Sequence, residues 1–377
     1  AIGGRLGFGI DGGRWRLGGF SWLRHRRRFL FRRWRFLRIH HGHAKAHGQH
    51  HCGKFQITPH GVRLLWFGAS FKRQASIRRI WSCAASTNSQ APRVNLAGAI
   101  QTATATLAAA GVENPRVDAE WLMAHLLDCR RPELALRREE ELSEPQAGQW
   151  VTLIARRAER IPLQHLLGTA EFCGLEIAVN LSVLIPRPET ERLAEVAWQF
   201  ANTRERPTIL DFGPGSGCLA IAIATNCPGA KVHALDISPA ALAMARANAA
   251  RHQVSERIIF HEGDGFAALS DGVGFDLIVS NPPYIPHDRM ATLDRNVRDH
   301  EPAMALDGGS DGLDIVRRIL VGVPGVLKPG GLMLIEIDDS HAAAACDLAA
   351  AVEGLCDVSI CRDDFGDDRF IRAVRTR

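Results

Sequence analysis

Short apolar runs alternate with longer helical patterns through the second half of this sequence. Five runs have the character of buried strands, and they lie at residues 208–212, 231–235, 257–261, 275–280 and 332–337. Helical patterns separate several of them, at about 217–226, 239–251 and 311–327. This alternation predicts a doubly wound α/β sheet with right-handed crossovers.

The part of the chain before these strands has a helical period. Three helices are predicted, over about 95–110, 115–129 and 143–160. Asn95 is a candidate cap for the first helix, and Gly111 ends it. We therefore expect a small helical domain over residues 92–165.

The segment that joins the two patterns has a period of its own. Residues 171–179 alternate apolar and polar positions toward their end, as a β-hairpin does. Pro186 and Pro188 then make the chain extended and stiff, and a helix is predicted from Glu189. We therefore expect a hairpin linker over residues 166–190, followed by an α/β domain over 191–377.

Residues 1–91 differ from the rest in composition. The first 90 residues hold 18 Lys and Arg against one acid, Asp11, whereas the remainder holds 28 basic and 40 acidic residues. Residues 24–38 would form a basic amphipathic helix, and they also resemble an organelle transit segment. The His-rich stretch 40–52 lacks a zinc-finger spacing, so no metal site is predicted there. We expect 1–91 to be a disordered extension, either transit-like or from a start site placed too far upstream.

The overall composition excludes several classes. Nine cysteines without a CxxC pair argue against a zinc ribbon or a disulfide framework, and they fit a reducing cytoplasm. No uncharged apolar run is long enough to span a membrane. The acidic balance after residue 90 argues against tight binding to nucleic acid.

The first predicted strand runs into a glycine-rich loop, residues 211–217 (DFGPGSG). Alternate glycines let the backbone approach a ligand and open the next helix, whose N–H groups face the crevice. The loop reads GxGxG rather than GxGxxG, so it is an imperfect dinucleotide fingerprint, although a loop of this kind alone would also fit NAD or FAD.

Two more strand ends carry acidic residues. Asp236 lies 19 residues beyond Gly217, where a carboxylate commonly accepts hydrogen bonds from ribose hydroxyls, or else caps the strand end. After the third strand, Asp264 would meet an adenine amino group and Phe266 the face of the ring, with a plain turn as the alternative.

The fourth strand ends at Asn281-Pro282-Pro283-Tyr284. The two prolines end the strand and stiffen the turn. The Asn281 side chain and the carbonyl of Pro282 offer two adjacent acceptors, which suit a planar –NH2 group of an amide or a base. Tyr284, the one tyrosine of the chain, would lie against that flat group. If the fourth strand neighbours the first, this turn and the glycine loop share one crevice.

Together these motifs resemble the PrmC/HemK family of class I methyltransferases, which have a Rossmann-like sheet. The resemblance covers 92–377 and includes 185–191 (IPRPETE), 211–217, 281–285 and 301–313. It implies transfer of a methyl group from S-adenosylmethionine to the side-chain amide (N5) of the glutamine in the GGQ motif of class 1 peptide chain release factors. The helical domain would then recognise the protein substrate, and the enzyme is expected to be a cytoplasmic monomer. The residues expected to bind the cofactor are Gly213, Pro214, Gly215, Ser216, Gly217, Asp236, Asp264, Gly265, Phe266 and Asn281; those expected to bind the glutamine are Asn281, Pro282, Pro283 and Tyr284, of which Asn281, Pro282 and Tyr284 are catalytic.

The sequence departs from the family pattern at three places. Gly265 stands where an aromatic residue is frequent, Cys173 replaces an aromatic residue, and Asp338 follows Glu336-Ile337 in place of glycine. Two related activities remain open: methylation of adenine N6 in DNA or RNA, and methylation of a ribosomal-protein glutamine. A non-catalytic nucleotide-binding scaffold is a further alternative, against which the intact Asn281–Tyr284 turn argues.

Overall fold

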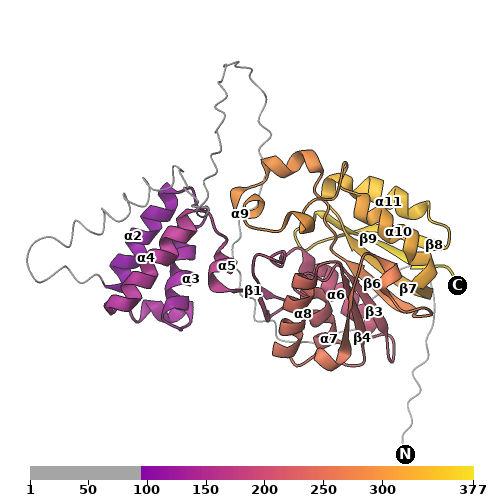
Figure 1. Cartoon of the computed structure of the whole chain (residues 1–377), viewed down its shortest axis with the longest axis horizontal. Helices are drawn as coiled ribbons and strands as arrows, with labels where there is room; N and C mark the ends of the chain where they lie inside the picture. Colours follow the sequence, from indigo (N-terminus) through magenta and orange to yellow (C-terminus); the bar gives the residue numbers. More distant parts are fainter. Residues whose placement is uncertain (1–94) are drawn as a thin grey trace, which may run out of the picture. The chain divides into compact units, whose positions relative to one another are not determined.

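The structure, a computed structural model, describes residues 95–377. The extension predicted over 1–91, with its basic helix and His-rich stretch, lies outside the described residues. Figure 1 shows the described elements coloured along the chain.

The first described elements are helices packed on one another (Figure 1). Asn95 caps the first by accepting from Gly98 N at 2.9 Å, and Ser143 and Gln146 form a capping box at the start of another. Trp150 and Leu122 are fully buried between them. The three predicted helices are confirmed. The elements are α2 (Leu96–Ala109), α3 (Pro115–Leu126), η1 (Arg131–Ala135), α4 (Glu144–Ala158) and α5 (Leu163–Leu167).

The predicted hairpin consists of β1 (Thr169–Phe172) and β2 (Leu175–Ala178), paired antiparallel. Cys173 and Gly174 form its turn, with φ of 51° and 74°, which suits a tight two-residue connection. Asn248 fixes the hairpin in place, because its side chain bonds both to Ala178 N and to Ala178 O at 2.9 Å. The same amide also donates to Ser216 O at 2.9 Å, so the hairpin is tied to the glycine loop.

A seven-stranded sheet follows, in the order β5-β4-β3-β6-β7-β9-β8. β3 to β7 run parallel, and β9 is antiparallel to both of its neighbours. The strand order reverses beside β3, which pairs with β4 on one side and β6 on the other, as predicted. The strands are β3 (Thr208–Phe212), β4 (Lys231–Asp236), β5 (Ile258–Glu262), β6 (Phe275–Ser280), β7 (Leu327–Glu336), β8 (Leu355–Arg362) and β9 (Asp368–Arg375).

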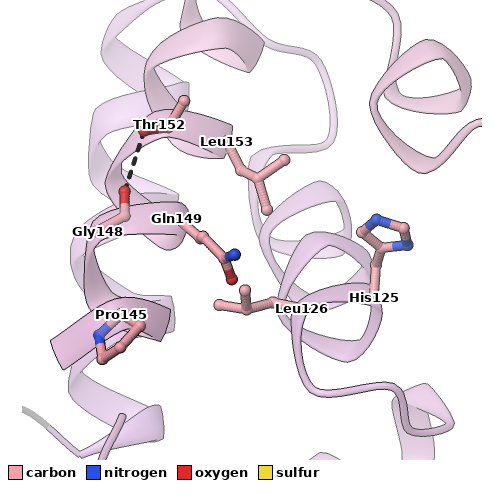
Figure 2. A pocket seen from close by; sticks show the side chains of 7 residues that line it. All are labelled: His125, Leu126, Pro145, Gly148, Gln149, Thr152 and Leu153. Carbon is pink, nitrogen blue, oxygen red and sulfur yellow. Dashed lines mark hydrogen bonds between the residues drawn. The ribbon is translucent and has the colours of Figure 1, made fainter. Parts of the chain in front are cut away.

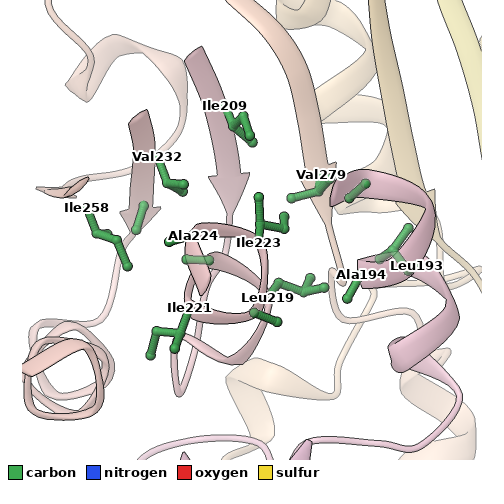
Figure 3. Packing of buried hydrophobic residues seen from close by; sticks show 14 of the residues in the cluster. Leu193, Ala194, Ile209, Leu219, Ile221, Ile223, Ala224, Val232, Ile258 and Val279 are labelled. Carbon is green, nitrogen blue, oxygen red and sulfur yellow. The ribbon is translucent and has the colours of Figure 1, made fainter. Parts of the chain in front are cut away.

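Helices cover both faces of this sheet. Consecutive strand residues point to opposite faces, so Ile209 joins one core and Leu210 the other. Figure 3 shows the first core, where Leu219 and Ile223 pack near Ile209 and Val279. Its helices are α6 (Thr190–Ala201), α7 (Cys218–Asn226) and α8 (Pro239–Arg251), and those of the second core are α10 (Asp314–Val326) and α11 (Ala342–Ala350).

The remaining short elements lie in the connections. They are η2 (Ser255–Arg257), η3 (Phe266–Ala268), η4 (His287–Thr292), α9 (Arg295–Arg298), η5 (Ala303–Ala305) and η6 (Asp339–His341). Within residues 95–377, no helix combines the length and apolar character needed to cross a membrane.

Candidate active site

A cavity of about 460 Å³ opens where the carboxyl ends of β3, β4, β5 and β6 meet. Segments distant in the sequence line it together, as expected at the point where the strand order reverses. The predicted site residues among its lining are Gly213, Pro214, Gly215, Ser216, Asp236, Asp264, Gly265, Asn281, Pro282 and Pro283. Gly217, Phe266 and Tyr284 are absent from the lining.

The three glycines of the loop after β3 do different things. Gly213 and Gly215 have φ of +76° and +56°, and a Cβ on either would meet nothing within 4 Å. Side chains there would therefore project into open space beside the cavity. Gly217 has φ of +83°, and a Cβ on it would lie 3.0 Å from Ala245 Cβ of α8. Its role is thus close packing of α7 on α8 rather than lining the cavity.

Two carboxylates support this loop. Asp236 accepts from Gly215 N at 3.1 Å and from Ser238 N at 2.9 Å, and it also lines the cavity. Asp236 therefore caps the end of its strand and also faces the cavity, so both interpretations of this residue apply. Burial raises its pKa, against the lowering effect of these backbone N–H groups.

Asp211, at the end of β3, is the second of these carboxylates. It is fully buried, and it accepts from Ala220 N at 3.0 Å through Oδ2. Its Oδ1 has no hydrogen-bond partner among the described residues, and neither has Ser216 Oγ. Burial raises the pKa of Asp211 to about 7. Buried polar atoms without partners are rare, and of these two residues Ser216 lines the cavity whereas Asp211 does not.

The turn after β5 contributes Asp264 and Gly265 to the cavity. Phe266, predicted to face adenine, packs instead against Phe212, with ring centroids 5.2 Å apart. On its other side it lies against Gly322 of α10, where a Cβ would come within 2.2 Å of the Phe266 ring. A direct contact of Phe266 with a ligand therefore stays a prediction without support from the geometry of the cavity.

The Asn281 side chain is oriented by a neighbouring segment. Its Nδ2 donates to Thr190 Oγ1 at 3.1 Å. Among the described residues, none donates to Asn281 Oδ1 or to the carbonyl of Pro282. Asn281 and Pro282 both line the cavity, and the predicted use of these two acceptors by a ligand stays a prediction.

Tyr284 lies behind this turn. It is partly buried and outside the cavity lining. A glycine-rich segment presses on its backbone: a Cβ on Gly308 would lie 2.8 Å from Tyr284 Cα, and one on Gly312 would lie 2.4 Å from Tyr284 O. Ile285 completes the contact by exchanging backbone hydrogen bonds with residues 306 and 308. This close approach gives a physical reason for the glycines at 308 and 312.

The segment before α6 and the first residue of that helix provide residues that the site prediction did not include. Pro186, Arg187 and Thr190 all line the cavity. Arg187 Nη2 is 2.7 Å from Glu301 Oε1, and the second oxygen of Glu301 accepts from Ile185 N at 3.1 Å. Because the Glu301 side chain is 1% exposed, this ion pair firmly fixes the stiff proline segment. In the sequence, the signal that could have indicated these cavity residues was the close spacing of two prolines with Arg187 and Thr190.

Glu336 is a further buried carboxyl group, and it lies outside the cavity lining. It ends β7 and is fully buried. Burial raises its pKa to about 7, and the Thr190 hydroxyl acts in the opposite direction. Neither carboxyl oxygen forms a close hydrogen bond among the described residues. Asp338, the departure noted above, accepts from Ser340 N at 3.0 Å and so starts η6.

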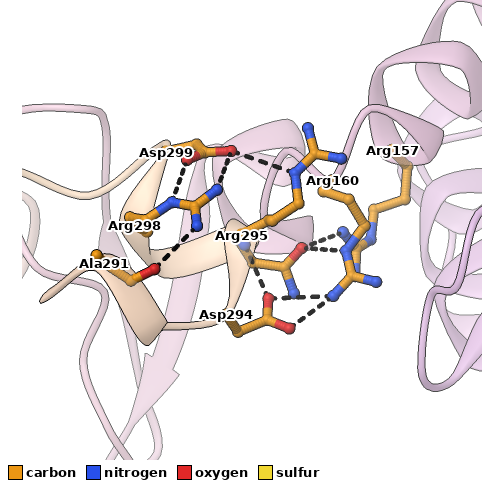
Figure 4. Close-up of polar contacts among 8 residues, drawn as sticks. Arg157, Arg160, Ala291, Asp294, Arg295, Arg298 and Asp299 are labelled. Carbon is orange, nitrogen blue, oxygen red and sulfur yellow. Dashed lines mark hydrogen bonds and ion pairs between the residues drawn. The ribbon is translucent and has the colours of Figure 1, made fainter. Parts of the chain in front are cut away.

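The connection between β6 and α10 is anchored on α4 and the turn that follows it. Arg160 is 2.8 Å from Asp294 Oδ2 and 2.9 Å from Asn296 Oδ1. Arg157, paired with Asp118 at 2.7 Å, also reaches Asn296. Figure 4 shows Arg157 and Arg160 directed at this connection, while Arg298 and Arg295 pair with Asp299 within it. The same connection then supplies Pro302, Met304 and Ala305 to the cavity lining.

A second hollow, of about 600 Å³, lies between α3 and α4 (Figure 2). His125 and Leu126 face Gln149 and Leu153 across it. His125 is the one ionisable side chain among the described residues that line this hollow. The described lining of the hollow therefore has no pair of ionisable residues that could act together in catalysis. Among residues 95–377, no group of three or more His, Cys, Asp or Glu is arranged to hold a metal ion.

The cavity at the carboxyl ends of β3 to β6 fits the adenosyl group of S-adenosylmethionine. Its volume is in the range of ligand pockets, roughly 300–1,000 Å³. A carboxylate at the end of β4 suits ribose hydroxyls, and the open glycine positions admit the ligand close to the backbone. Ser216, whose Oγ has no hydrogen-bond partner among the described residues, lines the same cavity.

Comparison with known proteins agrees with this geometry. The family described as PrmC N-terminal domain matches residues 98–168, and the family described as Methyltransferase small domain matches residues 195–300. The release factor glutamine methyltransferase of Geobacter sulfurreducens is 43% identical over 265 residues, which are 70% of this chain and 91% of that protein. The protein of the same name from Moorella thermoacetica is 43% identical over 282 residues, 75% of this chain and 99% of that protein. This chain therefore belongs to the release factor glutamine methyltransferase family.

Proposed function

We propose that this protein transfers the methyl group of S-adenosylmethionine to the side-chain amide nitrogen, N5, of the glutamine in the GGQ motif of class 1 release factors. The observation that carries the proposal is the placement of two acceptors, Asn281 Oδ1 and the Pro282 carbonyl, in the same cavity as the Gly213–Ser216 loop, with no donor to either among residues 95–377. Relatives 43% identical over most of their length are named release factor glutamine methyltransferase.

The chemistry asks mainly for positioning. A primary amide nitrogen is a weak nucleophile because its lone pair is delocalised into the carbonyl. S-adenosylmethionine supplies an electrophilic methyl group on a sulfonium. Asn281 Oδ1 and the Pro282 carbonyl would accept the two N–H bonds and so hold the nitrogen in one orientation. Pro186, Pro282 and Pro283 line the cavity and would leave less room for water around the nitrogen.

The bonds balance without a strong base. The amide nitrogen forms one bond to the methyl carbon, the S–C bond breaks with its electron pair going to sulfur, and one N–H proton leaves to solvent. Thr190 accepts from the Asn281 –NH2 group, so that the amide oxygen is left to accept from the substrate.

The other site residues divide by role. We assign Gly213, Pro214, Gly215, Ser216, Asp236, Asp264 and Gly265 to cofactor binding, and Asn281, Pro282 and Pro283 to the glutamine. Gly217, Phe266 and Tyr284 support the walls of the site from behind. We further propose that residues 92–165 recognise the release factor, that 166–190 form the linker, and that the protein acts as a monomer in the cytoplasm.

Methylation of adenine N6 is the second candidate, since an exocyclic amine is also a planar –NH2. The balance of 28 basic and 40 acidic residues after residue 90 disfavours a polyanionic substrate. The acceptors of the Asn281 turn would suit the –NH2 group of either substrate. An activity assay therefore has to distinguish glutamine methylation from adenine methylation.

The test uses the full chain with methyl-labelled S-adenosylmethionine, offered a class 1 release factor, a ribosomal protein mixture or DNA and RNA. We expect label on the release factor glutamine alone. Asn281→Ala should lower kcat by at least about 100-fold with little change in cofactor affinity. Asn202→Ala removes an amide on the surface, bonded to Asn226 O, and is the matched control. Label on nucleic acid but not on the release factor would refute the proposal.

A further inference from the structure

One wall of the cavity is built by α10 and the turn after β5. Ile315 and Arg318, three residues apart on α10, line it together with Asp264 and Gly265. Residues at this spacing share one helix face. Arg318 is thus the cationic side chain that α10 directs to the cavity.

The backbone of the β5 turn is bare on this side. Gly265 has φ of +80°, and a Cβ on it would lie 3.7 Å from Arg318 Nη2, which is ordinary contact distance. The next residue, Phe266, is turned onto Phe212 and Gly322 and leaves the cavity wall. The guanidinium of Arg318 therefore occupies the space beside Gly265 that no side chain of the turn fills.

Asp264 holds Arg318 in this position. Arg318 Nη2 donates to Asp264 Oδ1, and no described residue donates to the second oxygen, Oδ2. The two side chains are 51% and 61% exposed, so the ion pair contributes little to folding. Its evident consequence is orientation: it places a planar cation and a vacant carboxylate oxygen side by side at one end of the cavity.

We propose that Arg318 is a binding residue for the adenine base of the cofactor, with its guanidinium packed on the ring while Asp264 Oδ2 accepts from the exocyclic amine. This inference rests on the proposed function for the identity of the ligand. Arginine stacks on aromatic planes better than lysine does, because its charge is delocalised over a flat group. Asp264 then serves both partners, one through each oxygen.

The adjacent arginine provides a matched control. Arg317 precedes Arg318 on α10 and pairs with Asp311 and Asp314, at 2.9 Å and 3.1 Å. It does not line the cavity. Removing Arg317 therefore deletes the same charge and a comparable exposed ion pair without touching the proposed base site.

The experiment is calorimetric titration of S-adenosylhomocysteine into the full chain. Arg318→Ala should weaken binding about threefold to thirtyfold. Arg318→Lys, which retains the cation but not the plane, should recover less than half of that loss on a logarithmic scale. Arg317→Ala should bind within twofold of wild type. Thermal unfolding without ligand should be the same for all variants.

A second ligand separates packing from hydrogen bonding. S-inosylhomocysteine carries a carbonyl in place of the amine, so it loses the donor to Asp264 but retains the ring. Arg318→Ala should weaken both ligands by the same factor, whereas Asp264→Asn should weaken S-adenosylhomocysteine more than S-inosylhomocysteine. Wild-type affinity in Arg318→Ala, or full recovery in Arg318→Lys, overturns the inference.

Failure of this inference differs from failure of the proposed function. A wild-type chain that methylates the release factor while Arg318→Ala binds normally overturns only the role of Arg318. A chain that shows the Arg318 effect on cofactor affinity but leaves the release factor unmethylated overturns only the proposed function.

Discussion

The Asn281 side chain donates through Nδ2 to Thr190 Oγ1 at 3.1 Å, and this bond joins the turn after β6 to the first residue of α6. Thr190 is 1% exposed, so no water competes for its oxygen. The bond therefore decides which end of the Asn281 amide is left for a ligand, and it connects the proline segment before α6 to the proposed chemistry.

Thr190→Val should separate positioning from binding. The substitution preserves shape but removes the acceptor, which leaves the half-buried –NH2 group of Asn281 without this partner and allows the amide to rotate. We expect kcat for release factor methylation to fall about tenfold while the Kd for S-adenosylhomocysteine is unchanged. Thr190→Ser, which retains the hydroxyl, is the control and should recover most of the rate. Equal rates in Thr190→Val and wild type would show that Asn281 is oriented by something else.

Glu336 should make stability depend on pH. Burial raises its pKa from 4.5 to about 7 in the folded protein, so folding favours the neutral form. The stability that the folded protein gains from holding Glu336 neutral is fully present below about pH 4.5. It is lost as pH rises through 7. Glu336→Gln, which stays neutral, should thus be more stable than wild type at pH 8, by at most about 3 kcal/mol, and nearly equal to it at pH 5.

The measurement is chemical denaturation of both proteins at the two pH values. Asp211, whose pKa burial also raises to about 7, gives a slope of the same sign and is present in both. Only the difference between the two proteins therefore reports Glu336. A difference that does not change between pH 5 and pH 8 contradicts the assignment.

The parallel core of the sheet was predictable because its strands are short apolar runs with helices between them. The two last strands were not predicted. β8 lies at the edge of the sheet, where Leu355 is its one buried residue and the others are half-buried or exposed, and it includes Asp357 and Arg362, so its hydrophobic signal is weak. The start of β7 was set too late, since Lys328-Pro329-Gly330-Gly331 resembles a turn although the strand begins at Leu327.

In the candidate active site, too, some residues could be predicted from the sequence and others could not. The glycine loop and the Asn281 turn are contiguous motifs, and each reaches the cavity as predicted. Arg318 reaches the cavity only through the packing of α10, which spacing in a sequence does not specify. Phe266 shows the opposite case: it is adjacent to the cavity in sequence, but the space beside Gly322 receives its ring.

Gly213 and Gly215 offer a test of the open cradle. Gly215→Ala should place a methyl group in the cavity and force a non-glycine residue to φ near +56°, which costs about 1 kcal/mol. We expect the Kd for S-adenosylhomocysteine to rise at least about tenfold, with a smaller loss of stability. Gly325→Ala is the matched control, because Gly325 lies in α10 with open space around it and should become slightly more stable. Calorimetry measures the loss of ligand affinity and thermal unfolding measures the loss of stability, so together they separate the two effects of Gly215→Ala.

Arg160 should affect the protein substrate but not the cofactor. Its side chain binds Asp294 and Asn296, in the connection that later supplies Met304 to the cavity. Arg160→Ala removes this anchor, so the connection should become less ordered and kcat/KM for the release factor should fall about tenfold. The Kd for S-adenosylhomocysteine should stay within twofold, because none of its proposed contacts comes from this connection.

The control for Arg160 is Arg116→Ala, which deletes an exposed arginine paired with Glu120 one turn away on the same helix. Such a pair contributes about 0.3–0.5 kcal/mol, and its loss should leave both constants unchanged. Hydrogen exchange of residues 285–300 provides an independent readout, since loss of the anchor should accelerate exchange there in Arg160→Ala alone. Slow exchange in that variant together with a reduced kcat/KM would mean that Arg160 contacts the release factor directly rather than through the connection.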